Sequence, residues 1–396
     1  MRALVITSYD ESALERRPRY MLGKISVASR LLTELSQEKI SLIRTHIPPP
    51  LNLAYAKASL REYFHGRRVS GAFPASIDPD VLRAWAHRID AAIRRHNPSV
   101  VFFPENLWAI GFLTTHVPVV LWSDCLSSDM LRSYAIPFNP RAMDSLRAAE
   151  TRTLARCSRI LCTSQWMADS VLRRCIPKSC VDILGIFPGL ACADRHTAAN
   201  IGRWADARAE DSVFRVLFLG SDWVRKGGSF AALLHAALRK KGIESAFTFM
   251  GDIPDLPAEP SLRILRGRRT ADDIHQELTK AHIVLLPSKA ECCTHFIADA
   301  AGHGVPVLVS DVGGNATAVA NGTSGFLFPQ CASVEEYATR IMELSQNRSL
   351  YRSLSLSAYA FYVDHLRVSL ASQGVLRTFG AVTETPCFTS RQHIHD

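Results

Sequence analysis

The stretch AHIVLLPSKAECCTHFIADAAGHGVPVLVSDVGGNATAVANGTSGFLF, residues 281–328, decides the fold. Its first apolar run, Ile283–Leu286, is ended by a proline, and a short run bounded in this way is typical of a buried parallel strand. A helix is expected to begin near Thr294 and to close at Gly302, before a second strand at Val305–Val309. This order of strand, loop, helix and strand predicts an α/β sheet.

Two carboxylates follow the first of these strands. Glu291 lies in the loop just past the strand's carboxyl end, and Asp299 comes eight residues later, inside the expected helix. In open α/β sheets, ligands bind beyond the carboxyl ends of the strands. We therefore expect Glu291 and Asp299 to belong to one ligand site.

The same alternation of strands and helices runs through all 396 residues, which predicts parallel sheets with helices on both faces. The small, polar and charged stretch ACADRHTAANIGRWADARAED interrupts it and is the best candidate for an interdomain linker. The expected fold class is α/β, with two doubly wound, Rossmann-like domains facing a central cleft. The expected boundaries are 1–190 for the first domain, 191–211 for the linker, 212–350 for the second domain, 351–380 for C-terminal helices that cross back to the first domain, and 381–396 for a tail.

The composition is ordinary for a soluble globular protein, with 47% hydrophobic and 21% charged residues. No apolar run approaches the ~18 residues needed to cross a bilayer. The opening MRALVITSYDE has too short an apolar core for a signal sequence, so we expect a cytoplasmic protein. The ten cysteines show no C-x-x-C pair and no metal-site or disulfide spacing. Reduced thiols are therefore expected, with no metal site and no cofactor.

The net charge of +9 favours anionic partners such as nucleotide phosphates or anionic lipid head groups, although a basic solvated surface would give the same balance. The sequence has no zinc-knuckle spacing, no basic low-complexity tail and no RNP-type aromatic strand, which excludes nucleic acid as the main partner. The basic cluster REYFHGRR at 61–68 is either a solvated loop or a contact surface for an anionic acceptor or membrane. Peripheral contact with the inner membrane face stays an open alternative.

A second loop of the later half, GSDWVRKGG at 220–228, also leaves the carboxyl end of an expected strand. Arg225 and Lys226 stand beside Gly227, where a helix is expected to open, and two cations at a helix N-terminus suit a diphosphate. The loop lacks the G-x-x-x-x-G-K-[ST] pattern of a P-loop. The alternative is that both cations are ordinary surface charges.

A third loop carries Gly267 and Arg268, and a glycine there would let a planar base approach the backbone, unless the segment is an ordinary turn. Carboxylates such as Glu291 and Asp299 can accept two hydrogen bonds from the vicinal diol of a ribose or hexose. A glycosidase-type acid–base pair is the competing interpretation, but it leaves the diphosphate-like loop unexplained.

Several motifs together, covering nearly all of Val213–Ser345 in order and spacing, resemble the retaining glycosyltransferases of family four, which have the GT-B fold. VPVVLWSD and the stretch beginning ETRTLARC extend the resemblance more weakly into the first half. The motifs of the second half are SDWVRKGG, HIVLLPSKAE, the acidic residue at 299 followed by Ala300, HGVPVLVSDVGG and NGTSGFLF.

The resemblance implies a donor site for a nucleotide diphosphate sugar, such as a UDP- or GDP-sugar. Lys226, helped by Arg225, would neutralise the diphosphate, while Glu291 would contact the transferred sugar and steady the developing oxocarbenium charge. Asp299 matches the family's second glutamate, which holds the ribose. The resemblance also assigns Cys293 and Thr294 to the sugar and phosphate through backbone amides, Gly23 to the diphosphate, and Asp124 to an acceptor or sugar hydroxyl.

The sequence departs from the family pattern where the donor is expected. Glu291-Cys292-Cys293-Thr294 replaces E-G-F-G, and Asp299 is one methylene shorter than glutamate. Ser221 replaces an arginine common in the phosphate loop, Ser123 stands where a histidine is common, and the Gly-rich loop of the first domain is reduced to Gly23.

The function predicted is transfer of a hexose, with retention, to a hydroxyl of a glycan or lipid-linked saccharide. A degenerate GT-B binding protein and a nucleotide-sugar epimerase on the same fold are the alternatives.

Overall fold

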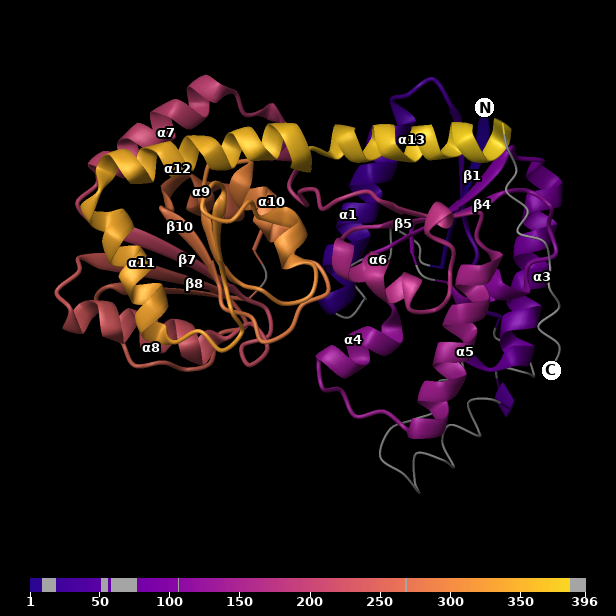
Figure 1. Ribbon diagram of the computed structural model, residues 1–396, viewed down its shortest axis with the longest axis horizontal. Coiled ribbons are helices and arrows are strands. Elements are labelled where there is room, and N and C mark those ends of the chain that lie inside the picture. Colours follow the sequence, from indigo (N-terminus) through magenta and orange to yellow (C-terminus); the bar gives the residue numbers. More distant parts are fainter. Residues whose placement is uncertain (9–18, 51–55, 58–76, 106, 268, 385–396) are drawn as a thin grey trace. The chain divides into compact units, whose positions relative to one another are not determined.

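A computed structural model describes residues 1–8, 19–50, 56–57, 77–105, 107–267 and 269–384 (Figure 1). The chain forms two compact units, one of Met1–Leu184 with Ala371–Asp396 and one of Gly185–Leu370. The cluster at 61–68 and Arg268 lie outside the described residues, as do residues 385–396 of the expected tail.

The first unit contains a parallel six-stranded sheet with the order β2-β1-β3-β4-β5-β6. The short runs of buried apolar residues in β3 and β4 are what a sheet covered on both faces requires. Its strands are β1 (Arg2–Thr7), β2 (Ser41–His46), β3 (Val100–Phe103), β4 (Val119–Ser123), β5 (Arg159–Cys162) and β6 (Val181–Ile183). Its helices are α1 (Arg19–Ser36), α3 (Pro79–His96), α4 (Ser127–Ser133), α5 (Pro140–Arg156) and α6 (Gln165–Leu172).

The second unit contains another parallel six-stranded sheet, ordered β12-β11-β10-β7-β8-β9. Within this unit β7 is the first strand and β10 the fourth, so the order is that of dinucleotide-binding domains, and its switch point lies between β7 and β10. The strands are β7 (Phe214–Gly220), β8 (Ser245–Gly251), β9 (Leu262–Arg266), β10 (Ile283–Leu286), β11 (Val307–Ser310) and β12 (Gly325–Phe328). The helices are α7 (Ala198–Glu210), α8 (Gly228–Lys240), α9 (Ala271–Lys280), α10 (Phe296–Ala301), α11 (Val334–Gln346) and α12 (Arg348–Phe361).

The last helix, α13 (Val368–Glu384), belongs mostly to the first unit. Its Phe379 packs edge-on against Phe102 of β3, with the ring centroids 5.5 Å apart. α12, which was expected to cross back with it, stays in the second unit. None of the helices in the described ranges is long and apolar enough to span a membrane.

The stretch 191–211 is folded and not a linker. A capping box formed by Thr197 and Asn200 starts α7, and the helix buries Ile201, Ala205 and Arg208. The Arg208 guanidinium donates to the carbonyls of 204, 281 and 303 and to the hydroxyl of residue 355. The polar composition was misleading because a buried arginine that makes four hydrogen bonds to its own unit belongs to a core.

Candidate functional site

The loop after β7 presents two cations in a fixed turn. A backbone hydrogen bond of 2.8 Å from Lys226 N–H to Asp222 O closes the turn. The Arg225 guanidinium Nε also donates to the Asp222 carboxylate, over 3.1 Å. Lys289 N–H donates to Arg225 O over 2.7 Å, which ties this loop to the loop after β10. The two loops therefore flank the switch point of the second sheet, where such sheets bind ligands.

Glu291 joins these two cations. Its Oε2 lies 3.0 Å from Arg225 Nη1, and its Oε1 lies 2.6 Å from Lys226 Nζ. The Glu291 side chain is 4% exposed and that of Lys226 is 11% exposed. We call Arg225, Lys226 and Glu291 the charge cluster. It carries one net positive charge, and its ions are largely removed from water, which makes their mutual attraction strong.

Two glycines let the backbone segments of the charge cluster meet. Gly227 has φ +77°, and a Cβ at this position would lie 2.0 Å from Pro287 O. Gly313 has φ +56°, and a Cβ there would lie 1.7 Å from Glu291 O. Neither approach leaves room for a side chain, so these glycines set the position of Lys226 and Glu291.

Two hydroxyls, each three positions from Glu291 in the sequence, are buried without a hydrogen-bond partner in the part of the chain that the structure describes. They are Thr294 Oγ1, in the loop before α10, and Ser288 Oγ, in the loop after β10. Native proteins rarely leave such groups unpaired, which points to a polar ligand or water at this place. Cys293, between them in the sequence, is half-buried, with its Sγ 3.5 Å from His295 Nε2.

Asp299 is buried within α10, which begins at Phe296 rather than at Thr294 as expected. Its Oδ1 accepts a hydrogen bond of 2.8 Å from Leu190 N–H, near the start of the second unit. The carboxylate is therefore already oriented by the backbone, whatever hydroxyl it contacts.

Gly267 follows β9 in the left-handed region, with φ +80° and open space where a Cβ would stand. It lines a cavity of about 410 Å³ with Trp223, Gly251, Asp252 and three further residues, Ile253, Pro254 and Arg266. The cavity lies beyond the carboxyl ends of β8 and β9, on the strand ends next to those that carry the charge cluster.

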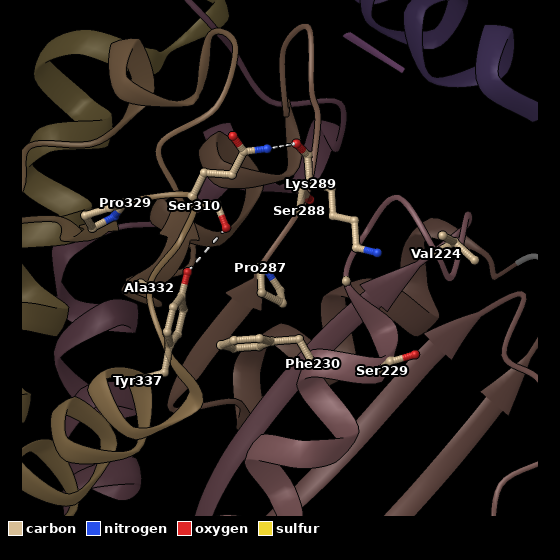
Figure 2. A pocket seen from close by; sticks show the side chains of 12 residues that line it. Val224, Ser229, Phe230, Pro287, Ser288, Lys289, Ser310, Pro329, Ala332 and Tyr337 are labelled. Atoms are coloured by element: carbon tan, nitrogen blue, oxygen red, sulfur yellow. Dashed lines mark hydrogen bonds between the residues drawn. The ribbon is translucent and has the colours of Figure 1, made fainter. Parts of the chain in front are cut away.

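A second cavity, of about 170 Å³, lies at the ends of β10 and β11 (Figure 2). Figure 2 shows the Lys289 side chain beside it, with Ser310 and Tyr337 on the opposite wall. The hydroxyls of Ser310 and Tyr337 are 3.4 Å apart. Gly227 and Ser288 also line this cavity, but none of the three members of the charge cluster does.

Comparison with known proteins shows what this architecture is similar to. Residues 213–347 match a family model described as "Glycosyl transferases group 1". No curated protein matches the sequence. A glycosyltransferase from Rickettsia africae superposes with a TM-score of 0.63 at 14% identity, covering 97% of this chain and 99% of that one. The chain has the GT-B fold.

Two further solved structures share this GT-B fold. Alr3699/HepE from Anabaena, in complex with UDP, gives a TM-score of 0.62 at 16% identity over 96% of this chain and all (100%) of that one. Sucrose-phosphate synthase from Thermosynechococcus elongatus gives 0.60 at 13% identity over 96% of this chain and 99% of that one. Membership of family four and retention of configuration stay predictions.

The first unit of the GT-B fold carries its own polar strand ends. Asp124 follows β4, is half-buried and accepts from Cys125 Sγ over 3.5 Å. Glu105, which the sequence did not single out, follows β3 and accepts from Ser8 N–H after β1, at the switch point of this sheet. Gly23, which was expected to stand for the Gly-rich loop of the first domain, lies inside α1, which begins at Arg19.

A group of metal-binding residue types also escaped the sequence analysis. Cys192, His196, His275 and His303 place their ligand atoms within 4.8 Å of one another. We call them the Cys–His cluster. Only the spacing of Cys192 and His196 is visible in the sequence, because the other two members are 79 and 107 positions beyond His196.

Proposed function

We propose that this protein is a glycosyltransferase that moves a hexose from a nucleotide diphosphate sugar to a hydroxyl of a glycan or lipid-linked saccharide, with retention. One observation carries the proposal: Arg225 and Lys226 converge on Glu291 at the switch point of the second sheet. Two cations and one carboxylate in this place match the diphosphate and the sugar of such a donor.

The ion pairs suggest how the donor enters. A diphosphate carries more charge than a carboxylate, so it would take over Arg225 and Lys226 and release Glu291. Glu291 would then accept from hydroxyls of the sugar and stabilise positive charge on the ring carbon as the bond to phosphate breaks. The unpaired Thr294 hydroxyl, three positions after Glu291 in the same loop, would meet the same ligand.

The base of the donor would lie in the 410 Å³ cavity next to Gly267, where Trp223 offers an aromatic wall. Asp299 would hold the ribose hydroxyls between base and diphosphate. In support, one neighbour of the same fold was crystallised with UDP and also with UDP-glucose. UDP is therefore the first nucleotide to test, with GDP as the comparison.

Transfer would proceed on one face of the sugar. The acceptor oxygen forms the new bond to the ring carbon while the bond to the leaving phosphate breaks, and a phosphate oxygen takes the acceptor's proton. Asp124 would orient an acceptor or sugar hydroxyl. On this scheme the protein supplies positioning and electrostatic stabilisation.

The test is titration with UDP and GDP, followed by release of nucleotide from a panel of donor sugars with saccharide and lipid-linked acceptors. We expect one nucleotide to bind and its sugar to be transferred. If the wild-type protein binds neither nucleotide, the proposed glycosyltransferase activity is refuted. Binding without turnover would favour a degenerate GT-B binding protein. Cys292 and Thr294, which stand in place of the two glycines, make this the second candidate.

A substitution separates the donor site from the rest of the surface. Lys226→Ala should weaken nucleotide binding by about 30-fold or more, since removing one partner of a desolvated charge pair costs ~2–5 kcal/mol. Lys240→Ala, an exposed lysine at the end of α8, is the matched control and should bind like wild type. Equal losses in both variants would mean that general charge, and not the site, attracts the nucleotide.

A further inference from the structure

The four members of the Cys–His cluster come from three segments of the second unit. Cys192 lies in the short 3-10 helix Ala191–Arg195, and His196 directly follows it. His275 lies in α9, and His303 lies in the turn after α10. We propose that Cys192, His196, His275 and His303 bind one Zn²⁺ as a structural site. This proposal does not depend on the proposed function.

The spacing of the ligand atoms suits a tetrahedral ion. His275 Nδ1 and His303 Nε2 are 2.9 Å apart, and Cys192 Sγ is 3.9 Å from His303 Nε2. All four ligand atoms lie within 4.8 Å of one another. Zinc bonds of about 2.0–2.3 Å place ligands of a tetrahedral site roughly 3.3–3.8 Å apart. Shifts of a few tenths of an ångström to about one would therefore close the cluster around the ion.

Backbone carbonyls already orient two of the rings. His196 Nδ1 lies 2.9 Å from Gly302 O, and His303 Nδ1 lies 2.7 Å from Asp299 O. A carbonyl can only accept, so both Nδ1 atoms carry the proton and both Nε2 atoms offer a lone pair. A ring nitrogen that donates to a carbonyl while its other nitrogen faces the cluster is the arrangement found around metal-bound histidines.

The surroundings favour a closed site. The Trp204 ring stacks on His303 at 14° between planes and meets His196 edge-on, with centroids 4.9 Å apart. His303 is fully buried, and the other three are partly buried. Three imidazoles and a thiolate suit zinc far better than Mg²⁺ or Ca²⁺, which prefer oxygen. With four protein ligands, no position is left for a substrate, so the site is structural.

Zinc would join the segments that hold α10. His303 is bonded to Asp299 O, and Asp299 Oδ1 is bonded to Leu190 N–H, two residues before Cys192. Binding would thus fix both ends of this chain of contacts. Without metal, the same four residues would be a hydrogen-bonded group in which His275 donates to His303, and the experiment must distinguish these two states.

The experiment measures the metal in tag-free protein purified without chelator. We expect stoichiometric zinc by elemental analysis in wild type and its loss in Cys192→Ser and His275→Ala, whose side chains are partly exposed and tolerate change. Cys331→Ser and His116→Ala alter an exposed cysteine and histidine elsewhere and should keep the zinc. Zinc retained in both cluster variants would overturn the proposal.

Cobalt gives a readout that does not rest on zinc surviving purification. Apo protein titrated with Co²⁺ should develop the visible absorption of a tetrahedral ion and a thiolate charge-transfer band. The Cys192→Ser variant should lose the charge-transfer band. Circular dichroism should show that this variant is still folded. Chelation should lower the Tm of wild type but not of His275→Ala. Protein that binds neither Zn²⁺ nor Co²⁺ would show that the cluster is only hydrogen-bonded.

Discussion

The charge cluster and the Cys–His cluster lie in the same unit, but they are built from opposite chemistry. In the charge cluster, Glu291 neutralises two cations that an incoming anion could take over. The Cys–His cluster presents lone pairs of its rings and a thiol, and backbone carbonyls orient the rings of His196 and His303. An anion can open the first cluster, whereas a cation can close the second. The sign of the charge that would complete a polar cluster therefore indicates which ligand it binds, whereas polarity alone does not.

Replacing the carboxylate should have the largest effect. Glu291→Gln keeps the shape of the side chain but removes the charge that would stabilise the transition state, so turnover should fall about 10²–10³-fold. Nucleotide affinity should stay equal or rise, because Arg225 and Lys226 lose their competing partner. Steady-state kinetics and calorimetric titration measure the two effects. A loss of nucleotide affinity as large as the loss of turnover would contradict the displacement of Glu291 by the donor.

Substitution of Gly313, whose backbone packs against Glu291 O, should have the next largest effect. Gly313→Ala puts a Cβ 1.7 Å from Glu291 O at φ +56°, which should move the loop, lower stability by roughly 2–4 kcal/mol and reduce turnover. Gly322→Ala is the matched control, since Gly322 also has positive φ (+79°) but open space around it. The control bears the strain of φ alone, about 1 kcal/mol. Equal denaturant midpoints for the two variants would show that the close approach to Glu291 is unimportant.

A buried histidine outside both clusters tests how neutral imidazoles affect stability. His282 Nδ1 accepts from Arg215 N–H over 3.0 Å, and its Nε2 donates to Arg208 O over 2.6 Å. Burial, with Arg208 and Arg215 nearby and Asp211 opposing them, lowers its pKa from 6.5 to about 4. The unfolded chain therefore binds the proton first as pH falls.

The stability that His282 contributes should be complete above pH 6.5. It should be lost as pH falls from there to about 4, and the total loss should be roughly 3 kcal/mol. Denaturant unfolding of wild type and His282→Gln across this range measures the effect. The difference between their free energies of unfolding should shrink as pH falls. His116→Gln, at an exposed position, should show no such change relative to wild type. A difference that grows on acidification would mean that the folded state prefers the charged ring.

Much of the second unit could be predicted from sequence because strand and helix signals there are local. The buried run at Ile283–Leu286 forms β10, and Arg225 and Lys226 leave β7 beside it. The ion pairs that these two residues form with Glu291 could not be predicted from the sequence, because the partners are 65 or more positions apart.

The errors also have physical causes. The range 191–211 looked like a linker because an arginine reads as exposed, although Arg208 is buried by partners that lie up to 147 positions away. The Cys–His cluster was missed for the same reason, because its members are distant in sequence and only the fold joins them. The start of α10 was misplaced by two residues, since Thr294 does not cap the helix.

The smallest effect should come from one hydroxyl, and it distinguishes a ligand site from a structural defect. Thr294→Val keeps the shape of a side chain whose buried Oγ1 has no partner among the described residues. Removing the unpaired hydroxyl should stabilise the ligand-free protein by about 1 kcal/mol. If the hydroxyl meets the donor, the same change should weaken donor binding about 5-fold, which corresponds to one hydrogen bond of ~1 kcal/mol. Thr279→Val, at a partly exposed position of α9 where the hydroxyl donates to Gln276 O, is the control and should leave donor affinity unchanged. Greater stability with unchanged donor affinity would separate Thr294 from the donor site and leave the charge cluster to bind the donor without it.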